Sequence, residues 1–226
     1  MPGGVRERIS VLMVAARSFH DAVRKRASIA PLKLQVAAGS LFARFVSVLE
    51  SFETSKFTHW LSIKYPAMHC GYCRLPVCGC STEQRPDFVF EPLTEIPAEQ
   101  IGWSVHAWQA ILRGRYGDKN KGLGIDNIFA RLVSEIAEVI ELQEPQWQLV
   151  DLDRLEEEYY SELADVFAWI CAACSVMDIE LQEIVLRLYS KGCSVCRKPR
   201  CECKGIILVG DGSGTMAYRA ESVPVA

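Results

Sequence analysis

Two pairs of carboxylates in the second half of this 226-residue chain have the spacing of metal ligands on helices. Glu135 and Glu138 are three residues apart, and so are Glu162 and Asp165. Residues three apart are neighbours on a helix surface, so each pair would present its two carboxylates together. The short connection around Pro145 predicts that the two helices are antiparallel neighbours. Four converging carboxylates would supply the hard oxygen ligands that Mg²⁺ prefers.

Acidic pairs at this spacing are also common on solvated helix faces, and helical phase separates the two interpretations. At about 100° per residue, Glu162 and Asp165 fall in the apolar stripe of a helix that carries no charge from Val166 to Met177. A buried carboxylate is costly unless it is paired or binds a metal. Because no Lys or Arg lies nearby on this helix, a metal is favoured. Glu135 borders its apolar face, whereas Glu138 could be solvated.

Eight of the ten cysteines form two copies of the pattern C-x2-C-x4-C-x-C. The copies are Cys70, Cys73, Cys78 and Cys80, and Cys193, Cys196, Cys201 and Cys203. Four thiolates this close in sequence can surround a tetrahedral zinc ion. Disulfides and an iron–sulfur cluster are the alternatives, but a repeated four-cysteine cluster favours structural zinc. Cys171 and Cys174 lie in an apolar helical run and are expected in the core.

The repeated cysteine pattern predicts two related helical units. Leu41–Ser47 resembles Ile128–Ser134, but this offset of 87 residues differs from the 123 residues between the cysteine motifs. The first unit is therefore a shortened copy, or the similarity is a coincidence. The expected organisation is a non-catalytic helical unit with a zinc knob at 1–81, a proline-rich linker at 82–97, a catalytic unit with the second knob at 98–204, and a tail at 205–226.

Apolar periodicity predicts an all-α fold, an antiparallel helical bundle made of these two units. The expected helices are Val5–Ala27, Leu34–Glu53, Lys56–Tyr65, Ala98–Arg113, Asn127–Gln143, Asp153–Val176 and Ile179–Tyr189. A loop rich in glycine and polar residues is expected at Gly117–Gly124.

Composition and charge narrow the class of protein. A hydrophobic content of 50% excludes a largely disordered chain. The net charge of −3 divides into −10 between Glu135 and Asp165 and +7 elsewhere. The longest nearly uncharged apolar run, Val166–Met177, is shorter than the ~20 residues that span a bilayer. No signal-peptide pattern stands near Arg6 and Arg8. A cytoplasmic protein without a membrane partner is expected.

The carboxylate motif resembles that of the MazG-like all-α nucleotide pyrophosphohydrolases, a family that includes dimeric dUTPases. The family motif is EExxE followed by ExxD. Here the two parts are Ser134-Glu135-Ile-Ala-Glu138 and Glu162-Leu-Ala-Asp165-Val-Phe, with Ser134 in place of the first Glu. The resemblance implies Mg²⁺-dependent hydrolysis of a nucleoside triphosphate to a monophosphate and pyrophosphate, for house-cleaning or control of the dNTP pool. The four acidic residues would hold Mg²⁺.

The resemblance covers about Ile101–Cys203, and the cysteine cluster after Tyr189 resembles a knob of some family members. On the first helix of this region, where the family contacts the nucleoside, Trp103 and His106 could line a base pocket. Aromatic residues at helical spacing more often belong to a core. Because the first unit lacks a matching carboxylate pair, we expect it to pack against the catalytic unit as a second subunit does in homodimeric relatives.

A triphosphate substrate also requires cationic contacts. The candidates are Lys119, Lys121, Arg187 and Lys191, each of which could instead be a solvated surface charge.

Two other classes of function stay open. Basic residues around the second knob favour a nucleic-acid-binding module, although this cluster is short and the first knob has only Arg74, so nucleic acid is the weaker partner. These residues are Arg197, Lys198, Arg200 and Lys204. The missing carboxylates of the first unit favour a catalytically inactive interaction protein. A homo-oligomer is compatible with each of these functions.

Overall fold

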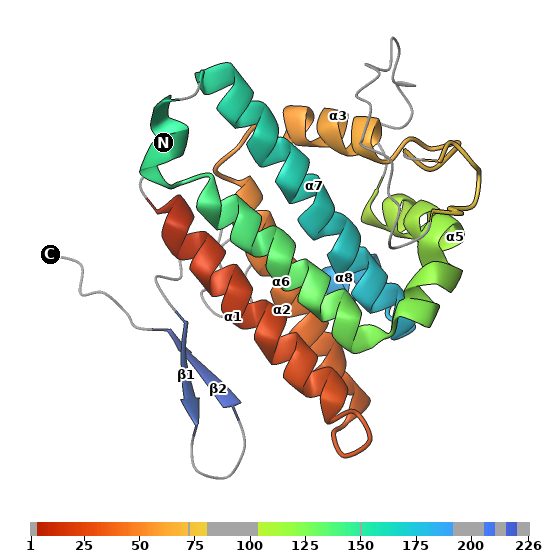
Figure 1. Ribbon diagram of the computed structural model, residues 1–226. Coiled ribbons are helices and arrows are strands. Elements are labelled where there is room, and N and C mark those ends of the chain that lie inside the picture. Colours follow the sequence, from red (N-terminus) through yellow and green to blue (C-terminus); the bar gives the residue numbers. More distant parts are fainter. Residues whose placement is uncertain are drawn as a thin grey trace, which may run out of the picture.

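The fold of the chain is all-α, as the sequence predicts, in a computed structural model that describes residues 4–71, 73–80, 104–149, 151–191, 206–210 and 216–220 (Figure 1). The α-helices of this described part are α1 (Val5–Arg24), α2 (Pro31–Leu49), α3 (Thr54–Lys64), α5 (Val105–Leu123), α6 (Ile125–Glu141), α7 (Leu152–Val176) and α8 (Leu181–Tyr189). A 3₁₀-helix, η1 (Pro145–Leu149), connects α6 to α7.

The expected tail contains two antiparallel strands, β1 (Ile206–Gly210) and β2 (Met216–Ala220). Ile206 pairs with Ala220 at one end of this ladder, and Gly210 pairs with Met216 at the other. The expected linker at 82–97 lies outside the described residues.

The expected loop at Gly117–Gly124 is wrong, because α5 continues through this segment to Leu123. Tyr116 and Leu123 pack against the hydrophobic core, and this packing offsets the low helix propensity of Gly117 and Gly122. The helix ends at Gly124, whose φ of +80° is a backbone conformation that glycine adopts without steric strain. Its carbonyl then accepts the first hydrogen bond of α6. The connection between α5 and α6 is therefore a single residue.

Helix α7 lies at the centre of the bundle and packs against α3, α5 and α6 (Figure 1). Its residues from Leu163 to Ser175 are mostly buried, as expected for a helix that is apolar on nearly every side. Helices α1 and α2 form an antiparallel pair that packs against α6 and α8. The arrangement places α3 and α6 on neighbouring faces of α7, and this geometry determines which side chains can meet there.

Helices from both expected units share one hydrophobic core. Phe45 of α2 and Phe57 of α3 pack on Phe167 of α7, with ring centroids 5.9 Å and 6.1 Å from that of Phe167. Aromatic pairs at such distances contribute beyond the area that they bury. The two-unit repeat stays a prediction, because the described helices pack as a single body of side chains rather than around two separate cores.

By length and composition alone, α2 is apolar enough to cross a bilayer, and 39% of its most apolar 18-residue window is buried in the protein. Its buried face, which includes Leu41 and Phe45, packs in the common core. A core helix of this kind passes the same test of length and hydropathy.

Substitution Phe45→Ala should lower the free energy of unfolding by about 3–5 kcal/mol, because it leaves a cavity beneath Phe167. The matched substitution Val46→Ala, at an exposed position of the same helix, should change it by less than about 0.5 kcal/mol. Urea titration followed by circular dichroism and by tryptophan fluorescence measures both values. A shared core predicts one coincident transition for Phe45→Ala, whereas two separated transitions would contradict it.

Candidate metal centres and pocket

Three of the four motif carboxylates converge between α6 and α7. One carboxylate oxygen from each of Glu135, Glu162 and Asp165 lies within 4.8 Å of the other two. Glu162 and Asp165 are one turn apart on α7, and the antiparallel packing of α6 brings Glu135 beside them. This group, called the carboxylate cluster below, could hold a metal ion.

The carboxylate cluster has an excess of negative charge at a partly buried site. Burial is the main cause that raises the pKa of Glu162 to about 8, and neighbouring carboxylates add to it while Lys64 opposes it. Burial, followed by the charges of Asp165 and Glu138, raises the pKa of Glu135 to about 7. Glu162 and Glu135 therefore ionise with difficulty unless a further positive charge approaches them.

One positive charge reaches the carboxylate cluster from a distant part of the chain. Lys64, the last residue of α3, lies with its Nζ 2.5 Å from Oδ2 of Asp165 and donates to the carbonyl oxygen of Ser161 (3.0 Å). The next residue, Tyr65, donates its hydroxyl to Oδ1 of Asp165 (2.5 Å). The side chains of Lys64 and Asp165 are only 11% and 18% exposed.

Both partners of Asp165 come from outside α7, so the sequence of that helix alone did not predict them. Lys64 and Tyr65 are about a hundred residues away in sequence, and no local pattern marks them. Part of the negative charge is therefore balanced by the protein itself.

The fourth motif carboxylate, Glu138, lies apart from this group. It is exposed, and the hydroxyl of Ser134 donates to it over 3.3 Å. Ser134 thus contacts a motif carboxylate from the position where the family motif has Glu. Glu138 still acts through its charge, which contributes to the raised pKa of Glu135 and of Glu162.

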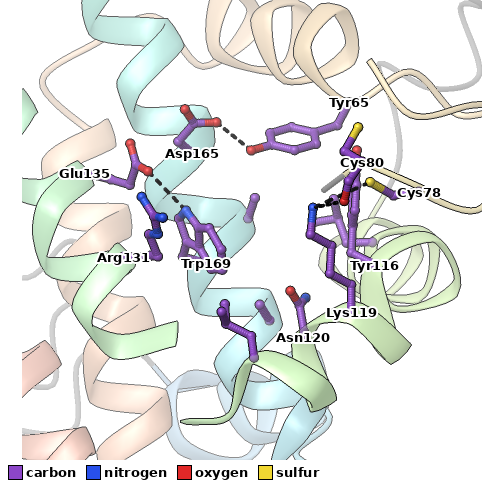
Figure 2. Close-up of a pocket in the computed structure, with 14 residues that line it drawn as sticks. Tyr65, Cys78, Cys80, Tyr116, Lys119, Asn120, Arg131, Glu135, Asp165 and Trp169 are labelled. Carbon is purple, nitrogen blue, oxygen red and sulfur yellow. Dashed lines mark hydrogen bonds between the residues drawn. The ribbon is translucent and has the colours of Figure 1, made fainter. Parts of the chain in front are cut away.

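A pocket joins the carboxylate cluster to the first cysteine motif (Figure 2). Glu135 and Asp165 lie on one side of it, and Cys78 and Cys80 lie on the other. Its volume of about 90 Å³ has room for several water molecules. The walls between the two sides include Tyr65, Tyr116, Asn120, Arg131 and Trp169. The indole nitrogen of Trp169 donates to Glu135 over 3.2 Å.

Of the residues expected to contact a substrate, Lys119 lines this pocket. Its ammonium donates to the carbonyl oxygen of Cys80 (3.1 Å) and lies 3.9 Å from Sγ of Cys78. Two further polar residues of the wall, Asn120 and Arg131, were missed by the sequence analysis. Arg131 lies one turn before Glu135 on α6, and this spacing is the signal that could have identified it.

The other described candidates lie outside the lining of this pocket. His106 is exposed and lies 3.4 Å from Glu180, while Arg187 donates to Gln35 of α2. Lys121 and Lys191 are exposed. Trp103 lies outside the described residues.

The first cysteine motif forms a compact group, called the first cysteine cluster below. Its four sulfur atoms, from Cys70, Cys73, Cys78 and Cys80, all lie within 4.8 Å of one another. The 4.0 Å between the sulfurs of Cys70 and Cys80 is about twice a disulfide bond length. It is close to the roughly 3.8 Å between two thiolates of a tetrahedral site with Zn–S bonds of about 2.3 Å. This cluster could hold a metal ion.

Hydrogen bonding differs among the four thiols. Burial acts to raise the pKa of Cys73, but backbone hydrogen bonds at Leu75 and Gly79 and the neighbouring thiols lower it to about 6. Burial raises the pKa of Cys80 to about 12. A bound metal ion would deprotonate the thiols that coordinate it. The second motif, Cys193, Cys196, Cys201 and Cys203, lies outside the described residues.

Cys171 and Cys174 are both fully buried in α7, as predicted. Burial raises the pKa of each thiol, that of Cys174 to about 12. They therefore act as small apolar side chains of the core.

No protein-family model, curated protein or solved structure matches the chain. The resemblance to the MazG-like family accordingly depends on the motif residues themselves.

Substitution Lys64→Met should destabilise the metal-free protein by about 3–5 kcal/mol, because it leaves the poorly exposed carboxylate of Asp165 without its charged partner. Lys56 is a matched control, since it also joins α3 to a carboxylate of α7, Glu156, but across an exposed pair 2.8 Å apart. Lys56→Met should change stability little. Urea titration in chelator measures both variants, and equal losses would contradict this account of the site.

The stability of the metal-free protein should fall as the pH rises from about 5 to about 8.5. The pKa of Glu162 is raised in the folded state, so its protonated form stabilises the fold at low pH and this stabilisation is lost as the pH passes through about 8. Glu162→Gln should flatten the decline, and the exposed Glu157→Gln on the same helix should not. Thermal melts at several pH values test this, and parallel profiles for all three proteins would contradict it.

Proposed function

We propose that the chain is a Mg²⁺-dependent nucleoside triphosphate pyrophosphohydrolase. The observation that supports this function best is the convergence of Glu135, Glu162 and Asp165 beside a pocket with cationic and amide groups in its wall. Carboxylates attract Mg²⁺, and the cationic groups of Lys119 and Arg131 suit the phosphates of a nucleotide. The motif resemblance supports the same reaction.

In this proposal Glu135, Glu162 and Asp165 are the direct ligands of Mg²⁺, and Glu138 contributes charge from the edge. When bound, Mg²⁺ would neutralise the triphosphate and activate a water for attack at the α-phosphorus. Trp169 orients Glu135 through its indole hydrogen bond.

In the pocket, Arg131 and Asn120 would bind the phosphates of the substrate. Lys119 lines the same pocket at the first cysteine cluster. Both four-cysteine motifs would bind structural zinc, because four thiolates leave no open position for catalysis. Trp103, which lies outside the described residues, is still proposed to contact the base of the nucleotide.

A second candidate function is a catalytically inactive interaction protein, and the position of Lys64 favours it. Its ammonium already neutralises Asp165, so the carboxylate cluster has one positive charge without any metal. The nucleic-acid alternative depends on basic residues of the second knob, which lie outside the described residues. The raised pKa values of Glu162 and Glu135 nevertheless indicate that one lysine leaves the site short of positive charge.

The test is an assay of pyrophosphate release by the purified protein from a panel of NTPs and dNTPs in Mg²⁺. We expect turnover of at least one nucleotide, and loss of at least about a hundredfold in kcat on Glu162→Gln, because a ligand of the catalytic ion is removed. Glu157→Gln, an exposed carboxylate on the same helix, is the matched control and should retain activity.

Absence of turnover on every nucleotide at high protein concentration would contradict the proposed enzyme. If Mg²⁺ then also failed to raise the melting temperature, the inactive protein would be favoured.

A further inference from the structure

We propose that the first cysteine cluster binds zinc and that this zinc holds one wall of the carboxylate pocket in place, so that the two metal sites are coupled. Residues 66–80, which follow Tyr65 and contain this cluster, are called the knob below. The zinc would thus have a positioning role beyond the local fold of the knob. It extends the proposed function but depends only on cation binding by the carboxylate cluster.

Residues of both sites line the same pocket. Cys78 and Cys80 share the cavity with Glu135 and Asp165 (Figure 2). Lys119 extends from α5 to the knob, where its ammonium donates to the carbonyl oxygen of Cys80 over 3.1 Å. A zinc ion with four thiolates has a net charge of about −2, which would attract this ammonium and keep it at the wall.

Hydrogen bonds in both directions join the knob to α5. Arg115 is 4% exposed, and its guanidinium donates to the carbonyl oxygens of Pro66 and of Ala67, the latter over 2.6 Å. In the opposite direction, the backbone N–H of Cys78 donates to the carbonyl oxygen of Arg115 (3.1 Å). Movement of the knob would therefore displace α5, which carries Lys119.

Two tyrosines connect the first cysteine cluster to Asp165. The rings of Tyr65 and Tyr116 meet edge to face, with centroids 6.2 Å apart. The hydroxyl of Tyr116 is hydrogen-bonded to Cys70 of the cluster. Tyr65 donates its own hydroxyl to Asp165. The knob segment begins one residue after Tyr65, so the geometry of the knob sets the position of this donor.

The knob has little apolar burial with which to hold its own shape. Its large apolar side chains Met68, Leu75 and Val77 are all more than half exposed. Arg74 has a φ of +59°, an unfavourable backbone conformation for a residue with a side chain. In small knobs of this kind, the free energy of metal binding supplies the free energy of folding. Zinc is the ion expected from four thiolates in tetrahedral reach.

The test compares Cys73→Ser with Cys196→Ser, which removes the corresponding ligand of the second motif. Each variant should lose about one zinc per chain by metal analysis. Mg²⁺ affinity, measured by isothermal titration, should be at least about tenfold weaker in Cys73→Ser than in Cys196→Ser, the size of effect seen when groups that orient metal ligands are removed. Equal Mg²⁺ affinities, with both variants folded by circular dichroism, would overturn the proposal.

A second measurement avoids the risk that Cys73→Ser does not fold. Cobalt replaces zinc in Cys196→Ser, so that the thiolate-to-cobalt absorption bands report on the first cysteine cluster. Addition of Mg²⁺ should shift these bands if the sites are coupled. Bands that do not move while Mg²⁺ binds, or a wild-type protein that binds no Mg²⁺, would overturn the inference. Coupled Mg²⁺ binding without pyrophosphate release would instead support the inference and contradict only the proposed reaction.

Discussion

The repulsion among three partly buried carboxylates is the constraint on which the rest of this structure depends. Glu135, Glu162 and Asp165 lie between α6 and α7, where water screens their charges poorly and the pKa of both glutamates is raised. An apolar bundle would be more stable without them. Lys64, the last residue of α3, and Tyr65, the residue after it, partly compensate through their contacts with the carboxylate of Asp165. Cation binding, as proposed above, would account for the retention of so costly an arrangement.

The sequence predicts the helices and motif ligands because these depend on local spacing. The phase of Glu162 on an apolar helix, for example, is a property of a few turns, and the convergence with Glu135 follows once α6 and α7 are antiparallel. The extension of α5 through Gly117 and Gly122 could not be predicted in this way. Both glycines disfavour a helix locally, and only the packing of Tyr116 and Leu123 against the core reverses that preference.

The same distinction applies to the candidate site. Lys64 and Tyr65 meet Asp165 only because α3 packs on α7, and a reading of single helices cannot detect such a pair. The four cysteines of the first motif were identifiable from spacing, since a tight loop brings them together locally. Their position beside the carboxylates was not, because it depends on the clamp by which Arg115 holds the chain at Pro66 and Ala67. The sequence therefore predicted the side chains that gather in the two described clusters, with Glu138 as the exception, and the fold added the position of one cluster beside the other.

The contact between Lys64 and Asp165 spans 101 residues of chain. Closing a contact this distant in sequence costs more chain entropy than closing a local one, because a longer loop must be restricted. During synthesis, helices α1 to α3 are made before α7. Until α7 is made, the apolar side chains Phe45 and Phe57 lack their partner Phe167. The segment after residue 98 would, on its own, lack both the lysine and the tyrosine. In evolutionary terms, the motif helices of this chain are not a module that recombination could move alone.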